Sequence, residues 1–365
     1  MKTPIRIFIG FLLFGLAEVL RAEVVAATPP AGCLKLTARG ASDSMLSAPL
    51  LRRAALLARV AAVSQGTITL AADDVADDAF APGLGGSYYA QFITGELEGL
   101  CFPILGNYGS ELSLATDGED LRSHPLGAIA AGEAGDLVRV RPYWAVSDVF
   151  GADDATRSLD PIEAPESGPY LASDAVMLPD NGAAGTEKRP LVISYVTGAG
   201  WRSTGSPSDD FAAQPLPPGV PFIVRRQRPE PVEMVLVGYV AQEAFRLRMP
   251  ALAPGEDRDV AVALAHPVDK RLADSRLFSA DGLQRAIDAS PDPLNLRDLV
   301  LEFDAGRRGF ALPPARRFCV IGTGWFETDV AADDHVLRFG AGCLLRLRGG
   351  RPVRYWMQGA PVWNP

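Results

Sequence analysis

The sequence predicts a mainly β protein, built from tandem antiparallel β-sandwich or barrel-like units with one short helix. Three observations lead to this prediction. The 365-residue chain is rich in turn-forming residues, with 36 glycines and 30 prolines. Apolar and polar residues alternate with a period of two in many short runs. A C-terminal segment also occurs twice, which predicts two C-terminal units related by duplication.

The repeat relates residues 176–238 to residues 300–359. Eleven identities share an offset of 124, and after a three-residue deletion, which we place in the proline-rich loop 211–218, the match resumes at an offset of 121. Glycines and prolines are the most frequent identical residues, and because they set backbone shape the repeat predicts a shared architecture rather than a shared chemistry. The residues of the first copy that are identical to the residue 124 positions later are Asp180, Gly182, Gly185, Pro190, Val196, Gly198, Gly200, Trp201, Thr204, Asp209 and Asp210.

Individual elements follow from local patterns. Alternation predicts strands at 66–70, 111–114, 137–144, 245–249 and 344–348. Residues 53–63 suit either a helix or a strand, and residues 280–289 predict the short helix. The order of the hairpins is not visible in one sequence, so sandwich and barrel stay open as alternatives.

Five segments are expected along the chain. Residues 1–22 resemble a signal peptide, because Lys2 and Arg6 precede the short apolar stretch 7–16; an uncleaved signal anchor is the alternative. An N-terminal β-rich unit (28–150) and a polar, proline-rich linker (151–169) follow. The two repeat units are 170–240 and 241–365. The chain is therefore expected to be exported to the periplasm, the cell surface or the medium, with no membrane span after signal cleavage.

The net charge and the four cysteines predict which partners the protein binds and which disulfide bonds it forms. The formal net charge of −9 gives no attraction to nucleic acid, so we expect none as a partner. Cys319 and Cys343 match Tyr195 and Phe222 in the first copy; if that pair lies on adjacent strands, the cysteines form one disulfide and Cys33–Cys101 the other. Free buried thiols are the alternative, and lipidation of Cys33 in the sequence PAGC is a further one.

Two sets of residues are candidate binding sites. The pairs Asp209–Asp210 and Asp333–Asp334 recur in both copies and could hold Ca²⁺, although such pairs also fix turns by accepting backbone N–H groups. Trp201 and Trp325 follow Gly-x-Gly in both copies. They could form exposed platforms for sugars or fill the cores of their units.

Motifs that carry catalysis are missing from the sequence, so no catalytic residue is predicted. There is no HExxH, GxSxG, Walker loop or GxGxxG after a predicted strand, and there are only three histidines. The carboxylate pairs of a glycoside hydrolase cannot be recognised without their separation.

Several motifs resemble one family. The segments GASDSMLSAPL (40–50), GDLVRVRPYWAVSDVF (135–150), VMLPDNGAAG (176–185), GAGWRSTG (198–205) and LPPGVPFIVRR (216–226) look like a paralogous family of exported β-rich proteins from verrucomicrobia-type bacteria. The resemblance implies export and paralogy, and it carries over no catalytic residues. The second copy reads GTGWFETD, so the resemblance implies no shared role for Arg202.

Two functions remain as hypotheses. The first is an exported, non-enzymatic envelope or extracellular protein with a structural, adhesive or glycan-binding role, whose partners are cell-envelope components or glycans. The second is a secreted carbohydrate-active hydrolase that uses carboxylates. Export, repetition and the missing catalytic motifs favour the first.

Overall fold

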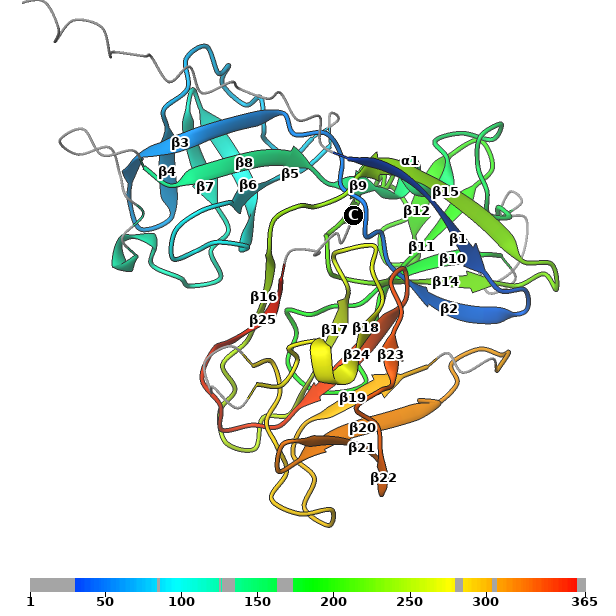
Figure 1. Ribbon diagram of the computed structural model, residues 1–365. Coiled ribbons are helices and arrows are strands. Elements are labelled where there is room, and N and C mark those ends of the chain that lie inside the picture. The colour runs from blue at the N-terminus through cyan, green and yellow to red at the C-terminus, as the bar shows by residue number, and fades with distance from the viewer. Residues whose placement is uncertain are drawn as a thin grey trace, which may run out of the picture.

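A computed structural model describes residues 30–83, 86–124, 126, 135–162, 173–279, 285–303 and 307–359. The prediction of a mainly β protein is confirmed, with 44% strand and 4% helix. The strands assemble into a closed six-stranded barrel and two further units that share one strand order (Figure 1). Three separate apolar clusters form the cores of the barrel, the first unit and the second unit.

The barrel is closed by antiparallel pairing in the order β3-β4-β7-β6-β5-β8. Residues 53–63, which suited a helix or a strand, contain β3, and alternate apolar side chains of every strand fill the interior. The strands are β3 (Leu56–Val63), β4 (Thr67–Leu70), β5 (Tyr88–Phe92), β6 (Cys101–Tyr108), β7 (Glu111–Leu114) and β8 (Leu137–Pro142).

The first unit contains a five-stranded sheet in the order β12-β11-β10-β14-β2 and two short antiparallel ribbons, β1-β15 and β9-β13. Its core lies between the sheet, the β1-β15 ribbon and a single α-helical turn, α1 (Val146–Phe150). The strands are β1 (Ala31–Ala38), β2 (Ser42–Leu46), β9 (Trp144–Ala145), β10 (Ala175–Leu178), β11 (Leu191–Val196), β12 (Gly200–Ser203), β13 (Pro215–Leu216), β14 (Phe222–Arg226) and β15 (Val232–Tyr239).

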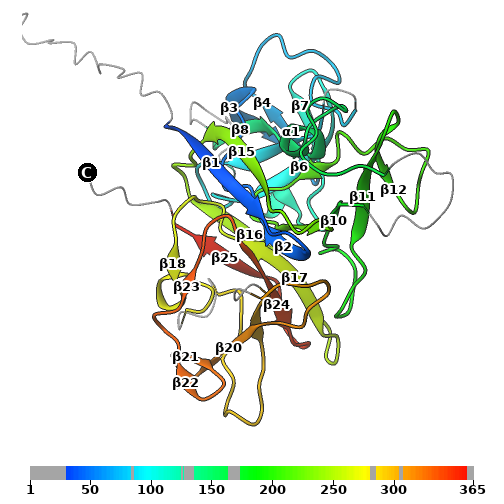
Figure 2. The same ribbon diagram turned by 90° about the vertical axis from the view of Figure 1, so that its right-hand side faces the viewer.

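The second unit repeats this arrangement strand by strand. Its sheet runs β17-β24-β19-β20-β21, with β22 added at the edge, and its ribbons are β16-β25 and β18-β23 (Figures 1 and 2). The strands are β16 (Phe245–Met249), β17 (Arg258–Ala263), β18 (Lys270–Arg271), β19 (Leu299–Glu302), β20 (Arg316–Ile321), β21 (Gly324–Glu327), β22 (Val330–Ala331), β23 (Val336–Leu337), β24 (Gly342–Leu347) and β25 (Arg354–Gln358).

The duplicated unit extends further upstream than the sequence repeat. Strands β1 and β2 pair with β15 and β14, so residues 31–46 belong to the first repeat unit rather than to a separate N-terminal unit. The barrel lies between β2 and β9 in the chain, where the second unit has only the short connection 264–269. The barrel is therefore an insertion into the first copy of the scaffold.

Two local predictions need correction. Residues 285–289 of the predicted helix 280–289 form no helix, and residues 280–284 lie outside the described part; α1 instead follows β9 directly. The first residues of the predicted linker, 151–162, pack on the first unit, where Leu159 is buried in the core and Ile162 bridges to Val196. The remaining linker residues, 163–169, lie outside the described residues.

The hairpin before each repeated tryptophan differs in length between the copies. In the first copy Val196 pairs with Gly200 across the turn, whereas in the second Ile321 pairs with Gly324. The second turn is one residue shorter, so β11 and β20, the strands directly before the two turns, are related by an offset of 125. The identity of Val196 and Val320 at an offset of 124 therefore does not reflect equivalent positions.

The deletion also lies elsewhere than predicted. The Phe211 N–H donates to the Trp201 carbonyl at 3.0 Å, and the Ala332 N–H donates to the Trp325 carbonyl at 2.8 Å. These contacts are equivalent, so Phe211 of the first copy corresponds to Ala332 of the second, and the offset between the copies is already 121 at this position. The deletion precedes the proline-rich loop 211–218 instead of falling within it.

The two units contact each other reciprocally. In β2 the Asp43 N–H donates to the Gly309 carbonyl at 3.0 Å, and in β17 the Asp259 N–H donates to the Gly185 carbonyl at 3.1 Å. Each glycine belongs to the loop that follows the central strand of the other unit, and the glycines match in the repeat. The interface has the pattern of a two-fold symmetric dimer within one chain.

The same loops make a second reciprocal contact. Two residues after each glycine, the N–H groups of Ala311 and Glu187 donate to the carboxylates of Asp43 and Asp259, at 2.8 and 3.1 Å. Ala311 and Glu187 both adopt left-handed backbone angles, with φ of 48° and 56°. The two loops therefore make matching backbone contacts at these positions although their side chains differ.

Each of these carboxylates is also held within its own sheet. Arg225 forms a two-point ion pair with Asp43 at 2.7 and 2.8 Å, and Arg346 forms one with Asp259 at 2.8 and 2.9 Å. Two-point guanidinium–carboxylate pairs fix orientation as well as position. The ion pair thus aims each aspartate at the loop of the other unit.

Candidate functional site

The two repeated tryptophans lie in the cores of their units. Trp201 is 0% exposed and its Nε1–H donates to the Gly151 carbonyl at 2.8 Å, while Trp325 is 2% exposed. Each follows the turn of its hairpin and pairs with a core residue of the preceding strand, Tyr195 or Val320. Neither ring faces solvent, so the arrangement suits packing rather than stacking on a sugar.

The aspartate pairs do not occupy equivalent places, because the deletion precedes Phe211. The carboxylate of Asp210 accepts from the Ala212 N–H at 2.9 Å, and that of Asp209 contacts the Ser208 hydroxyl. Asp333 accepts from the Trp325 N–H and Asp334 contacts Arg271. No group of three or more metal-ligating side chains occurs among the described residues. These contacts are those of turn residues and surface ion pairs.

The predicted disulfides are wrong, and all four cysteines are free. Strand β19 lies between β20 and β24, so Cys319 and Cys343 are not cross-strand neighbours, and neither are their predicted counterparts Tyr195 and Phe222. The shorter turn in the second copy also makes Ser194 the true counterpart of Cys319. Cys33 is exposed on β1, whereas Cys101 packs at the junction of the barrel with the other units.

Thiol reactivity should follow this placement. Burial raises the pKa of Cys101, Cys319 and Cys343, whereas Cys33 is exposed. We expect a disulfide reagent such as DTNB to titrate one thiol in the native protein and four in guanidinium chloride. In Cys33→Ser the native count should fall to zero. A native count of zero that rises only after reduction would instead indicate disulfides.

A polar cluster distinguishes the second unit from the first. Glu302, at the end of β19, lies 2.9 Å from His335 Nε2, and Arg316 donates to His335 Nδ1 at 2.9 Å. A guanidinium can only donate, so Nδ1 accepts and Nε2 carries the hydrogen that Glu302 accepts. The imidazole stacks on Phe318 with ring centroids 4.3 Å apart. Each ring nitrogen is therefore committed to one partner.

The same place in the first unit is apolar. Leu178 stands where β19 has Glu302, Leu191 where β20 has Arg316, and Phe222 where β24 has Cys343. All three belong to or pack against the first core. Because the scaffold is shared, the two units differ here in chemistry and not in backbone arrangement.

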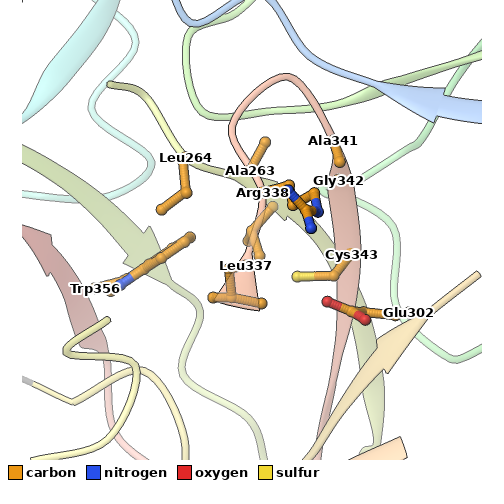
Figure 3. A pocket seen from close by; sticks show the side chains of 10 residues that line it. Ala263, Leu264, Glu302, Leu337, Arg338, Ala341, Gly342, Cys343 and Trp356 are labelled. Carbon is orange, nitrogen blue, oxygen red and sulfur yellow. The ribbon is translucent and has the colours of Figure 1, made fainter. Parts of the chain in front are cut away.

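The cluster borders a small cavity of about 20 Å³. Glu302, Cys343 and Arg338 line one side of it, and Leu264 and Trp356 line the other (Figure 3). Such a volume accommodates about one water molecule. Burial raises the pKa of Cys343 and the Glu302 carboxylate raises it further, so the thiol stays protonated and is a poor nucleophile.

A second polar site joins the barrel to the other units. His266 is 1% exposed, and its Nε2 lies 2.9 Å from the carbonyl oxygen of Glu243, whose carboxylate forms an ion pair with Arg139 of the barrel. Burial lowers the pKa of His266, and the positive charge of Lys270 lowers it further, against the opposing effect of Glu243. The folded protein therefore holds a neutral imidazole at this junction.

Acid should destabilise the protein through His266. Its pKa is depressed on folding, so below about pH 6.5 the unfolded chain binds a proton that the folded protein excludes. The free energy of unfolding should fall by up to about 1.4 kcal/mol per pH unit in this range, until the folded pKa is reached. Urea unfolding at pH 7.5 and 5.5 measures the loss. The loss should be smaller in His266→Gln, and an identical loss would refute the assignment.

The barrel carries an exposed aromatic residue that sequence reasoning missed. Tyr108, at the turn between β6 and β7, is 79% exposed, and Leu105 on the same strand is 58% exposed. The acidic loop 73–78 lies against this turn: Asp77 accepts from the Gly109 N–H at 2.7 Å, and the Ala76 carbonyl accepts from Asn107. Alternation along β6 would have placed Tyr108 inside with Phe102 and Ile104, because the register shift between Ile104 and Gly106 that turns it outward cannot be read from the sequence.

Comparison of the chain with protein-family profiles, curated proteins and solved structures gave no match. The resemblance to a family of exported proteins therefore stays a prediction. No helix in the described part of the chain has the length and apolar character needed to cross a membrane.

Proposed function

We propose that the protein is a non-enzymatic envelope or extracellular protein that binds glycans through the tip of its barrel. The observation that carries the proposal is Tyr108, whose ring is open to solvent at 79% exposure and lies beside an acidic loop. Sugars bind proteins by stacking their apolar faces on aromatic rings while nearby polar groups accept from the hydroxyls. The carboxylates of Asp73, Asp74, Asp77 and Asp78 supply such acceptors.

The two repeat units support this tip as a scaffold. Their repeated tryptophans, Trp201 and Trp325, lie in buried cores, and Asp43 and Asp259 form ion pairs that hold loops. Export of the chain and its residence in the envelope remain part of the proposal, and they rest on the N-terminal segment and the motif resemblance.

Binding of the full chain to isolated sacculi and to a panel of polysaccharides tests the proposal by co-sedimentation and affinity electrophoresis. We expect Tyr108→Ala to weaken binding at least tenfold, whereas Phe339→Ala, which truncates an aromatic residue 36% exposed in the second unit, should leave it unchanged. Equal binding by both variants would reject the barrel tip as the site.

Release of reducing ends from the same polysaccharides addresses the hydrolase alternative. The proposal expects none above the level of a heat-inactivated sample. Turnover that disappears in Asp77→Asn or Asp78→Asn would replace the binding protein with a carboxylate-dependent hydrolase.

A further inference from the structure

The outer face of the barrel carries buried polar side chains where β5 and β8 meet the other units. Gln91 of β5 is 0% exposed and Arg141 of β8 is 5% exposed. In the antiparallel register Gln91 lies opposite Arg139, two residues before Arg141, so the three side chains share one face of the sheet. Ala90 and Val140, the cross-strand pair between them, belong to the barrel core, which makes the shared face the outer one.

The positive charge of Arg141 has no counter-ion. Its Nη1 donates to the Arg52 carbonyl at 2.7 Å, but its buried Nε has no hydrogen-bond partner, and no carboxylate of the described residues forms an ion pair with it. The two neighbouring arginines are balanced, because Arg139 pairs with Glu243 and Arg52 pairs with Asp148. Burial lowers the pKa of Arg141, yet a guanidinium stays charged in proteins. A buried cation without a partner is costly.

The other titratable groups near Arg141 supply no negative charge. Tyr89 lies opposite it on β5, and burial raises the pKa of the Tyr89 hydroxyl well above its usual value. Burial also raises the pKa of the Cys101 thiol and that of the Tyr143 hydroxyl. All three groups are therefore protonated at neutral pH, and the unbalanced charge of Arg141 remains.

Gln91 offers further hydrogen-bond donors beside this cation. Its Nε2 and Oε1 are both buried, and neither has a partner. Gln91 and Arg141 are diagonal neighbours across β5 and β8, a separation that long side chains can span. An anion between Arg141 Nε and Gln91 Nε2 would accept from both groups and also balance the charge. A water molecule would satisfy the donors but would leave the charge in place.

We propose that this junction binds a small monovalent anion, with chloride as its simplest form, between Arg141 Nε and Gln91 Nε2. The charges set the valence, because one guanidinium is unbalanced and a divalent anion would leave a buried negative charge. Cys101 packs here against an apolar cluster that includes Leu51, the residue before Arg52. The bound anion would therefore help to fix the barrel to the segment that leads into it. The site uses no residue of the barrel tip, so it does not depend on glycan binding.

Thermal unfolding of the full chain in chloride and in gluconate tests the proposal. Equal ionic strength in the two media removes differences in general screening. We expect chloride to raise the melting temperature in a saturable way and gluconate, which is much larger, to have no such effect, since a ligand of the folded state alone stabilises it. Bromide should replace chloride. The ³⁵Cl NMR line should be broadened by the protein and sharpened again by added bromide.

Two variants assign the effect to its residues. Arg141→Met should abolish the chloride dependence, and in gluconate it should unfold at a temperature at least as high as the wild-type protein, because no unbalanced charge is then buried. Gln91→Leu keeps the charge but removes a donor, so it should weaken chloride binding by about tenfold. It also serves as the test if Arg141→Met does not fold. Arg52→Met is the matched control: it changes an arginine that has a carboxylate partner and keeps the carbonyl that Arg141 uses, so chloride affinity should stay within about twofold.

Crystals grown in bromide locate the ion directly, and we expect an anomalous peak between the side chains of Arg141 and Gln91. Equal effects of chloride and gluconate on the melting temperature would overturn the proposal. So would an unchanged chloride dependence in both Arg141→Met and Gln91→Leu. Ordered water without anomalous signal at this position would show that the junction is hydrated instead of binding an anion.

Discussion

Replacement of Trp201 by alanine is expected to lower the free energy of unfolding of the first unit by about 3–5 kcal/mol. The indole is fully buried and its ring centroid lies 5.4 Å from that of Tyr195 and 6.0 Å from that of Phe150. Truncation therefore leaves a large cavity in a core that the surrounding sheet cannot close. It also removes the hydrogen-bond partner of the Gly151 carbonyl. Urea unfolding followed by far-UV circular dichroism measures the loss.

Two variants separate packing from the hydrogen bond. Trp201→Phe keeps an aromatic ring and should cost about 1–3 kcal/mol, since the Gly151 carbonyl loses its donor and some volume is lost. Leu294→Ala, at a side chain that is 99% exposed, should change stability by less than about 0.5 kcal/mol. A Trp201→Ala protein with nearly normal stability and impaired glycan binding would restore the surface-platform interpretation.

Replacement of Asp298 by alanine should be equally costly for the second unit, at about 3–5 kcal/mol. Asp298 and Arg351 form an ion pair at 2.5 Å in which both side chains are 1% exposed. Burial raises the pKa of Asp298 and lowers that of Arg351, so each charge is tolerated because of its partner. Removal of the carboxylate leaves the guanidinium charged and unpaired in the interior. Chemical unfolding at pH 7 measures the effect.

The carboxylate of Asp298 also binds two backbone N–H groups, so removing Arg351 as well should restore only part of the lost stability. It accepts from the backbone N–H groups of Asp288 and Arg348, at 2.7 and 2.8 Å. The double variant Asp298→Leu, Arg351→Leu removes both charges but leaves these donors unpaired, so it should recover only part of the loss. Full recovery would mean that the backbone contacts contribute nothing. Asp334→Ala, at a 90% exposed carboxylate, is the control and should be nearly neutral.

The first unit repeats this device with a different arginine. Asp174 accepts from the N–H groups of Asp160 and Gln227, both at 2.8 Å, and pairs with Arg226 of β14. Asp174 and Asp298 match in the repeat, whereas Arg226 and Arg351 do not: Arg351 follows β24 instead of lying within its counterpart strand. Both copies therefore have the buried carboxylate and its backbone contacts, but the arginine that pairs with the carboxylate comes from a different position in each copy.

Sequence reasoning succeeded where the information is local. Alternation located β7 and β16 at their observed bounds, because side chains of successive strand residues face opposite sides. It failed for the disulfide between Cys319 and Cys343, because a central strand separates β20 from β24 and strand order is a property of the whole sheet. It also paired Asp209–Asp210 with Asp333–Asp334, because the deletion precedes Phe211 and shifts the equivalent positions although the residues are identical at an offset of 124.

The sequence by itself determined that this protein is mainly β and that its last part was duplicated, because the alternation of apolar and polar residues and the recurrence of glycines at a fixed offset are local patterns of the sequence. Only the tertiary structure decided that β1 and β2 complete the first copy and that the barrel interrupts it. It also decided that the two copies contact each other through hydrogen bonds of Asp43 and Asp259. These features join residues that are remote along the chain. Such contacts depend on how sheets close and pack, and no local pattern records that choice.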